Sequence, residues 1–140
     1  MDNNLGTNIK YGITEMPKVA KPLKRVEKYW GYMETLFNFE GCTAKRIFMK
    51  KGSQSSLEFH CQKKEVYYIE SGILKVGVRI GRGENKSVLV EQGEIFHIKP
   101  GLMHMRMALT DCVIIEVSTK DEDSDSHIVA DGRTYVHKEN

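Results

Sequence analysis

The stretch that decides the fold is Gly52–Gly72, GSQSSLEFHCQKKEVYYIESG, in which Glu58, His60 and Glu65 stand between two glycines. Side chains two positions apart on a β-strand point to the same face, so Glu58 and His60 face one way and Glu65 can meet them from the next strand. Carboxylates and imidazoles are common ligands of divalent cations. The stretch therefore predicts two strands that share a metal site.

A second segment, Gly93–His104, GEIFHIKPGLMH, supplies a fourth candidate ligand. Pro100-Gly101 is a typical turn pair and can return a new strand over the same cavity, with His104 on it. We expect Glu58, His60, Glu65 and His104 to hold one divalent metal ion. Two carboxylates and two imidazoles suit Zn, Mn, Fe or Ni and do not discriminate among them.

Nine short apolar runs separated by glycine-bearing turns predict an all-β sandwich or barrel. The predicted strands are Tyr32–Phe39, Thr43–Lys50, Ser56–His60, Val66–Ile69, Ile73–Ile80, Ser87–Val90, Ile95–Ile98, His104–Leu109 and Val113–Val117. Residues 81–86 are expected to form a hairpin loop, and the acidic run 121–126 a solvated loop or short helical turn. Residues 1–25 are expected to be an irregular arm, which leaves 26–140 as the domain.

Composition narrows the function classes. The chain has 140 residues, 40 % hydrophobic and 29 % charged, which fits one globular domain without a membrane-spanning run. Its three cysteines form no C-x-x-C pair and its first residues are not those of a secretory signal, so a cytoplasmic location is expected. A net charge of +2, spread along the chain, gives no reason to expect nucleic acid as a partner.

The two segments resemble the cupin superfamily, whose motifs are G-x5-H-x-H-x4-E-x6-G and G-x5-P-x-G-x2-H-x3-N. Gly52, His60, Glu65 and Gly72 match the first motif, and Gly93, Gly101 and His104 match the second. Glu58, Lys99 and Ala108 depart from the motifs, at positions for histidine, proline and asparagine. The resemblance implies a cupin double-stranded β-helix, that is, a jelly-roll barrel.

Within that superfamily, the chain is most similar to the mannose-6-phosphate isomerase domain of bifunctional isomerase/guanylyltransferase enzymes. The similarity runs from about residue 25 to 135 and rests on Tyr29-Trp30-Gly31, residues 44–47, 57–60, 93–98 and 114–117, and the closing Asp131-Gly132-Arg133. Glu58 stands where that family has a glutamine ligand. Lys63 and Tyr67 stand where it usually has arginine and tryptophan.

Alternation along the strands places Tyr67 on the face of Glu65, and Arg106 on the face of His104, so both are candidates to line the cavity. Lys63, Lys45 and Arg133 are candidates to hold a phosphate or carboxylate at its mouth. The aromatic Tyr29-Trp30-Gly31 either closes the end of the barrel or stacks on substrate.

These features favour a metal-dependent sugar or sugar-phosphate isomerase whose general base the sequence does not identify. The alternatives are a different metal-dependent cupin enzyme, such as an iron dioxygenase, and a non-catalytic carbohydrate-binding cupin. A homodimer is expected, because pairing would cover an exposed edge strand or exchange the N-terminal arm.

Overall fold

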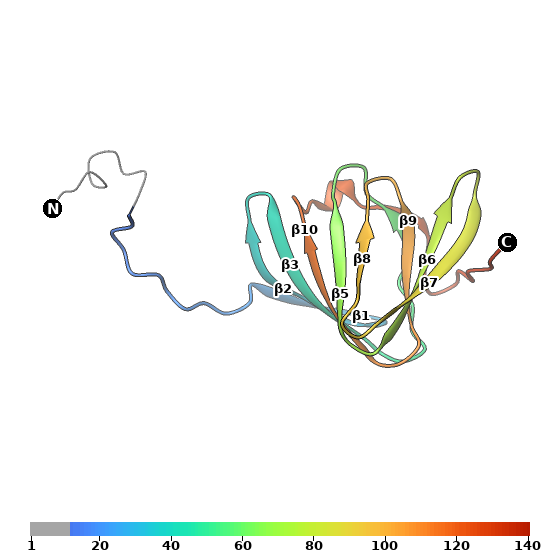
Figure 1. The fold of residues 1–140 in the computed structure, drawn as a ribbon, viewed down its shortest axis with the longest axis horizontal. Helices are drawn as coiled ribbons and strands as arrows, with labels where there is room; N and C mark the ends of the chain where they lie inside the picture. Colours follow the sequence, from blue (N-terminus) through green and yellow to red (C-terminus); the bar gives the residue numbers. More distant parts are fainter. Residues whose placement is uncertain (1–11) are drawn as a thin grey trace.

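Two antiparallel sheets face each other in the computed structural model, which describes residues 12–140 (Figure 1). One has six strands in the order β1-β2-β3-β10-β5-β8, and the other has five in the order β11-β4-β9-β6-β7. The strands are β1 Lys24–Lys28, β2 Gly31–Phe39, β3 Cys42–Met49, β4 Leu57–Phe59, β5 Glu65–Ser71, β6 Ile73–Ile80, β7 Glu84–Glu91, β8 Ile95–Ile98, β9 Met103–Ala108, β10 Cys112–Ser118 and β11 His127–Ala130. This is the predicted jelly-roll architecture, and it confirms the all-β fold.

The core lies between the sheets and follows from alternation along the strands. On β5, Tyr67 and Ile69 are fully buried whereas Tyr68 is 43 % exposed. Apolar side chains from both sheets meet in the interior, including Trp30, Ile47, Met49, Leu74, Val76, Ile98 and Ile114. Several polar side chains are buried as well, among them His60, Glu65, His104 and Glu116.

Each of the nine predicted strands overlaps an observed one. β1 and β11 were not predicted. β1 has the sequence KRVEK and is exposed at all five positions, so no apolar alternation marks it. It forms because β2 offers an unpaired edge, with Val26 opposite Met33.

One turn differs from the sequence prediction, and another depends on a glycine. The hairpin loop expected over residues 81–86 is shorter, because β7 begins at Glu84 and pairs with Ile80 across a turn of residues 81–83. At Gly101, between β8 and β9, φ is +87°, and its N–H donates to the carbonyl oxygen of His60 at 2.7 Å. That bond ties the two motif segments together at the site.

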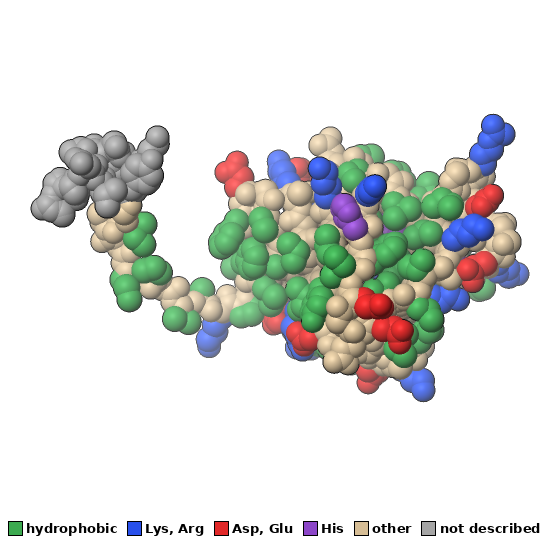
Figure 2. All heavy atoms as spheres, viewed as in Figure 1, with side chains coloured by type: hydrophobic (Ala, Val, Ile, Leu, Met, Phe, Trp, Pro, Cys, Tyr) green, Lys and Arg blue, Asp and Glu red, His purple; other side chains and the backbone are tan. Residues whose placement is uncertain are grey.

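The expected arm is only partly described, because residues 1–11 lie outside the described part of the chain. Residues 12–22 lead away from the barrel (Figure 1 and Figure 2), and Met16 and Val19 on this segment are 87 % and 102 % exposed. Pairing with the sheet begins at Leu23, whose N–H donates to Thr35, and β1 starts at Lys24, inside the segment expected to be irregular. Within residues 12–140 no helix has the length and apolar character needed to cross a membrane.

Candidate metal centre

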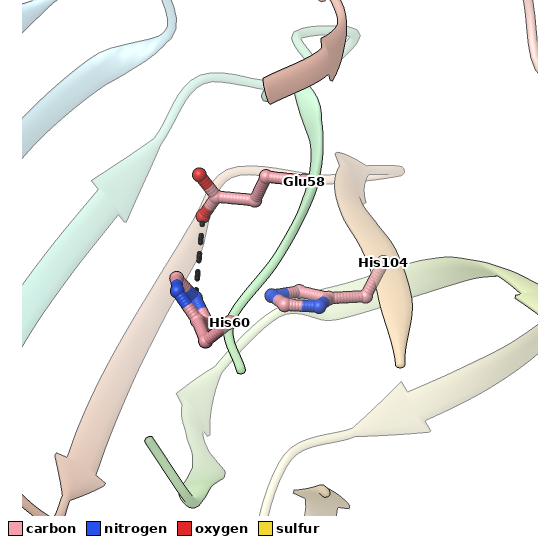
Figure 3. Close-up of side chains that lie close together, drawn as sticks. All are labelled: Glu58, His60 and His104. Atoms are coloured by element: carbon pink, nitrogen blue, oxygen red, sulfur yellow. Dashed lines mark ion pairs between the residues drawn. The ribbon is translucent and has the colours of Figure 1, made fainter. Parts of the chain in front are cut away.

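Glu58, His60, Glu65 and His104 meet at one end of the barrel interior. Glu58 lies on β4 opposite His104 on β9, His60 follows β4 directly, and Glu65 begins β5. Figure 3 shows Glu58, His60 and His104 with their polar ends turned toward one another. The sequence pattern placed these side chains on common faces, and the pairing of β4 with β9 brings the two motif segments side by side.

The separations among the donor atoms suit one shared cation. His60 Nε2 lies 3.1 Å from Glu65 Oε2 and 3.7 Å from Glu58 Oε1, and His104 Nε2 lies 3.3 Å from Glu65 Oε2. Two ligands about 2.1 Å from a metal are roughly 3.0 Å apart at a right angle and roughly 3.4 Å apart at a tetrahedral angle. One ion placed between these atoms would therefore reach them at ordinary bond lengths.

Both imidazole rings are oriented by hydrogen bonds from Nδ1. His60 Nδ1 lies 3.0 Å from the carbonyl oxygen of Asp125, and His104 Nδ1 lies 2.8 Å from that of Leu102. A carbonyl oxygen only accepts, so each Nδ1 carries the proton and donates. In the neutral ring this leaves the lone pair on Nε2, aimed at the other donors, as is typical of metal-ligating histidines.

Three atoms at the centre are buried without a hydrogen-bond partner: His60 Nε2, Glu65 Oε2 and His104 Nε2. Buried polar atoms in folded proteins are almost always paired, and leaving one unpaired costs about 1–3 kcal/mol. These three point to one place and include a carboxylate and two imidazole nitrogens. A divalent cation satisfies all of them at once.

The surrounding charges keep Glu65 ionised. Burial alone would raise the pKa of its carboxyl, but its close contacts with the His104 and His60 rings, together with the Lys63 ammonium, hold that pKa well below its usual range. Burial lowers the pKa of His60, yet its contacts with Glu65 outweigh this and raise the pKa overall. Glu65 therefore carries a negative charge at neutral pH, as a ligand of a cation requires.

A network of charged side chains that are buried or partly buried contacts Glu65. Lys63 Nζ lies 2.8 Å from Asp121, 3.5 Å from Glu65 and 3.8 Å from Glu116, and Lys45 Nζ lies 2.7 Å from Asp121. Burial lowers the pKa of Lys63, but Glu116, Glu65 and Asp121 raise it above its usual range, so the ammonium stays charged. The structure thus places Lys63 and Lys45 in contact with carboxylates of this chain.

Glu116 is the buried acid of that network. Burial and the nearby charge of Glu65 raise the pKa of its carboxyl to about 7, against the opposing effect of Lys63, Lys45 and Arg106. The sequence did not identify Glu116 as a candidate site residue. A charged residue at an inward position of the apolar strand β10 was the available signal.

Arg106 and Tyr67 lie in the interior as alternation predicted. Tyr67 is fully buried, Arg106 is 5 % exposed, and Arg106 Nη1 donates to the Tyr67 hydroxyl at 3.1 Å. Burial raises the pKa of Tyr67 well above its usual range, so its hydroxyl stays protonated. Arg133, by contrast, lies at the surface, where it pairs with Asp131 at 2.9 Å.

A pocket of about 160 Å³ opens beside the centre. Its walls include Glu58, Trp30 and Arg106, together with Lys28, Tyr29, Met33, Ser55, Ser56 and Ile128. Glu58 is the most exposed of the four candidate ligands, at 24 % of its side chain. The pocket therefore adjoins the Glu58 side of the centre, and both aromatic residues of the Tyr29-Trp30-Gly31 segment line it.

Asp125 organises the loop that carries His60, and sequence reasoning missed this role. Its carboxylate accepts from the backbone N–H groups of Cys61, Gln62 and Lys63 at 2.7–3.1 Å, and its carbonyl oxygen accepts from His60. Residues 123–125 form a 3-10 turn, within the segment expected to be a solvated loop or short helical turn. Asp125 thus connects the acidic run 121–126 to the candidate metal centre.

Comparison with known proteins identifies the family. The family model described as Cupin matches residues 15–138, so the chain belongs to the cupin family. A sequence comparison with curated proteins gives no match.

Several solved structures share the fold. The capsular polysaccharide assembling protein CapF from Staphylococcus aureus has a TM-score of 0.69 at 20 % identity, covering 79 % of this chain and 32 % of its own. Oxalate decarboxylase from Bacillus subtilis at pH 4.6 has a TM-score of 0.69 at 19 % identity, over 88 % of this chain and 34 % of its own. KdgF from Halomonas sp. has a TM-score of 0.62 at 15 % identity, over 76 % of this chain and 98 % of its own.

These similarities confirm the cupin fold. The chain spans about a third of the length of CapF and of oxalate decarboxylase, and its match to KdgF covers nearly the whole of that protein. Because one fold supports many chemistries, the reaction has to be argued from the site.

Proposed function

We propose that this chain is a metal-dependent cupin enzyme that isomerises a small sugar or sugar phosphate, with Glu58, His60, Glu65 and His104 as metal ligands. The observation that carries the proposal is the set of three buried donor atoms without partners, one each on His60, Glu65 and His104, that face one another. The isomerase assignment is supported by the similarity of the motif segments to the mannose-6-phosphate isomerase domain.

The chemistry follows from what each side chain is able to do. A bound divalent cation supplies Lewis acidity at a sugar carbonyl and stabilises the negative charge that develops when the neighbouring carbon loses its proton. Glu65 and the two histidines, held by Lys63 and the backbone carbonyls, orient the ligand atoms. The protonated Tyr67 hydroxyl accepts a hydrogen bond from Arg106 and so helps to hold that guanidinium in the wall of the pocket.

Glu58 tunes this centre. A carboxylate in place of the glutamine of the isomerase family adds a negative charge, which strengthens cation binding and weakens the Lewis acidity of the bound ion. Glu58 is also the carboxylate that borders the pocket, beside the open side of the centre. It therefore affects both metal affinity and turnover.

The test is metal analysis coupled to an isomerisation assay. Purified protein is dialysed free of metal, reloaded separately with Zn²⁺, Mn²⁺, Fe²⁺ or Ni²⁺, and assayed for interconversion of mannose 6-phosphate and fructose 6-phosphate. One bound ion per chain and turnover that depends on it are expected. His97→Ala, on an exposed position of β8, is the matched control for His104→Ala.

The possible outcomes separate the alternatives. A bound metal with sugar binding but no turnover would make the chain a carbohydrate-binding cupin, and metal-dependent oxygen uptake would make it a dioxygenase. Failure to bind any of the four metals would remove the basis of all metal-dependent functions.

A further inference from the structure

Arg106 is a buried cation on which the charges of Glu116 and Glu58 act only from a distance, without contact. Its side chain is 5 % exposed, and within residues 12–140 no carboxylate oxygen lies within 4.0 Å of its guanidinium nitrogens. Its Nε atom is buried with no hydrogen-bond partner. An unpaired buried charge is among the costliest groups in a protein interior, so its retention here indicates a partner that comes from outside the chain.

The other cations considered for substrate binding are already neutralised. Lys63 and Lys45 both contact Asp121 at 2.8 and 2.7 Å, and Arg133 contacts Asp131 at 2.9 Å. An incoming anion at any of them would have to displace a carboxylate of the protein. Arg106 requires no such exchange.

Two aromatic rings and one hydrogen bond fix the guanidinium. Its Cζ atom lies 5.1 Å from the centre of the Trp30 ring and 5.7 Å from that of Tyr67, and Nη1 donates to the Tyr67 hydroxyl. These contacts stabilise the charge and hold the plane of the group. They leave donors free that suit the two oxygens of a carboxylate or phosphate.

Arg106 lies in the wall of the 160 Å³ pocket that also contains Glu58 and Trp30. We propose that this pocket is an anion subsite, in which Arg106 binds the carboxylate or phosphate group of the substrate. The inference rests on the proposed function, because it takes the neighbouring metal centre as the place where the substrate reacts. It adds that the substrate is an anionic sugar rather than a neutral one.

The spacing limits the size of that substrate. Arg106 and His104 are two residues apart on one face of β9, which separates their backbones by roughly 6–7 Å. The pocket is smaller than the roughly 300–1,000 Å³ of ordinary ligand sites, so it accepts the anionic end and a few carbons. A substrate with its anionic group a few bonds from its carbonyl would reach both places.

The test uses Trp30, the chain's single tryptophan, as a reporter. Metal-free protein is titrated with inorganic phosphate, mannose 6-phosphate, glucuronate and mannose while Trp30 fluorescence is recorded. Inorganic phosphate and at least one of the two anionic sugars should give a saturable change, and neutral mannose should give none at the same concentrations. The preference between mannose 6-phosphate and glucuronate distinguishes a phosphate from a carboxylate substrate.

Variants assign the change to Arg106. Arg106→Gln should weaken the binding of inorganic phosphate at least tenfold, and Arg106→Lys should weaken it less. Arg46→Gln is the matched control, because Arg46 also donates to a tyrosine hydroxyl, that of Tyr32, and its loss changes the net charge equally. If Arg106→Gln fails to fold, thermal unfolding of the unaltered chain still tests the subsite, since phosphate should raise its Tm and mannose should not.

The subsite is overturned if Arg106→Gln binds phosphate as the unaltered chain does, if mannose perturbs Trp30 as strongly as the anions, or if phosphate leaves both the fluorescence and the Tm of the unaltered chain unchanged. Because these titrations contain no metal and no turnover, they remain informative if the isomerase assay fails. Arg106-dependent anion binding without isomerase activity would leave the subsite in place and remove only the reaction assigned to it.

Discussion

Residues 12–140 contain two groups of side chains of the types that bind metals, and the two groups differ in a way that separates a ligand site from chance proximity. The inner group contains Glu58, His60 and His104, and the outer group contains Cys61, Asp125 and His127. In each group the potential donor atoms lie within 4.8 Å of one another. Distance alone therefore does not distinguish them.

Hydrogen bonding does distinguish them. In the inner group, His60 Nε2 and His104 Nε2 are buried without partners. In the outer group, both carboxylate oxygens of Asp125 already accept backbone N–H groups, and Cys61 and His127 are exposed. The outer group also borders a hollow of about 630 Å³, larger than the inner pocket. Buried donor atoms without hydrogen-bond partners are thus a better guide to a metal site than the proximity of the side chains or the volume of the adjoining pocket.

Removing an inner ligand should have the largest effect. His104→Ala should lower the affinity for Zn²⁺ by more than about 100-fold, because loss of a direct ligand exceeds the 10–100-fold cost of losing an outer partner. Isothermal titration of metal-free protein measures this. If His104→Ala binds Zn²⁺ as tightly as the His97→Ala control does, His104 is not a metal ligand and the contrast between the two groups fails.

Glu116, which lies 3.8 Å from the Lys63 ammonium, should dominate the pH dependence of stability in the metal-free protein. Its folded pKa of about 7 lies above its unfolded value, so the folded state holds the proton more tightly and stability falls as pH rises through that window. The loss between pH 5 and 8 should be on the order of 2 kcal/mol, about 30-fold in the folding equilibrium. Urea unfolding of Glu116→Gln should show a flatter profile. Equal slopes for both chains would contradict a buried, proton-holding Glu116.

Glu58→Gln sharpens the description of the inner group. Removing one negative charge should weaken metal affinity about tenfold while preserving an oxygen ligand, and turnover by the metal-saturated protein should rise because the ion becomes a stronger Lewis acid. Metal titration and the isomerase assay measure the two effects separately. Complete loss of turnover with metal still bound would assign Glu58 to proton transfer instead.

Asp125 links the two groups, because it fastens the loop that carries His60. Asp125→Ala frees three backbone N–H groups and loosens His60, and should lower Zn²⁺ affinity about threefold to tenfold, as expected for a residue behind a ligand. Ser124→Ala on the same turn is the control. An effect as large as that of His104→Ala would mean that Asp125 itself binds the metal.

Cys61 and His127, the two exposed members of the outer group, should have the smallest effect. Cys61→Ser and His127→Ala, separately or together, should change Zn²⁺ affinity by less than about twofold, because the buried donor atoms without hydrogen-bond partners belong to the inner group. A second bound ion that disappears in these variants would show that the outer group is also a site.

Strands could be predicted from the sequence better than contacts between remote residues. Strand β5 was evident from its apolar pattern, and alternation correctly placed Tyr67 on the face of Glu65 and Arg106 on the face of His104. The short strand β11 was not evident, because it follows an acidic run and its face alternation is weak. Similarly, the role of Asp125 depends on a contact more than 60 residues away along the chain.

The sequence by itself determined the all-β barrel and the set of four candidate ligands, because strand periodicity and turn chemistry are local properties that residue order records. Only the tertiary structure decided which charges are used internally and which are left free. Lys63 and Arg106 are both inward cations, yet Lys63 contacts Asp121 whereas Arg106 contacts two aromatic rings and no acid of residues 12–140. Such pairing depends on distances between strands that are remote in the chain, which no local pattern encodes.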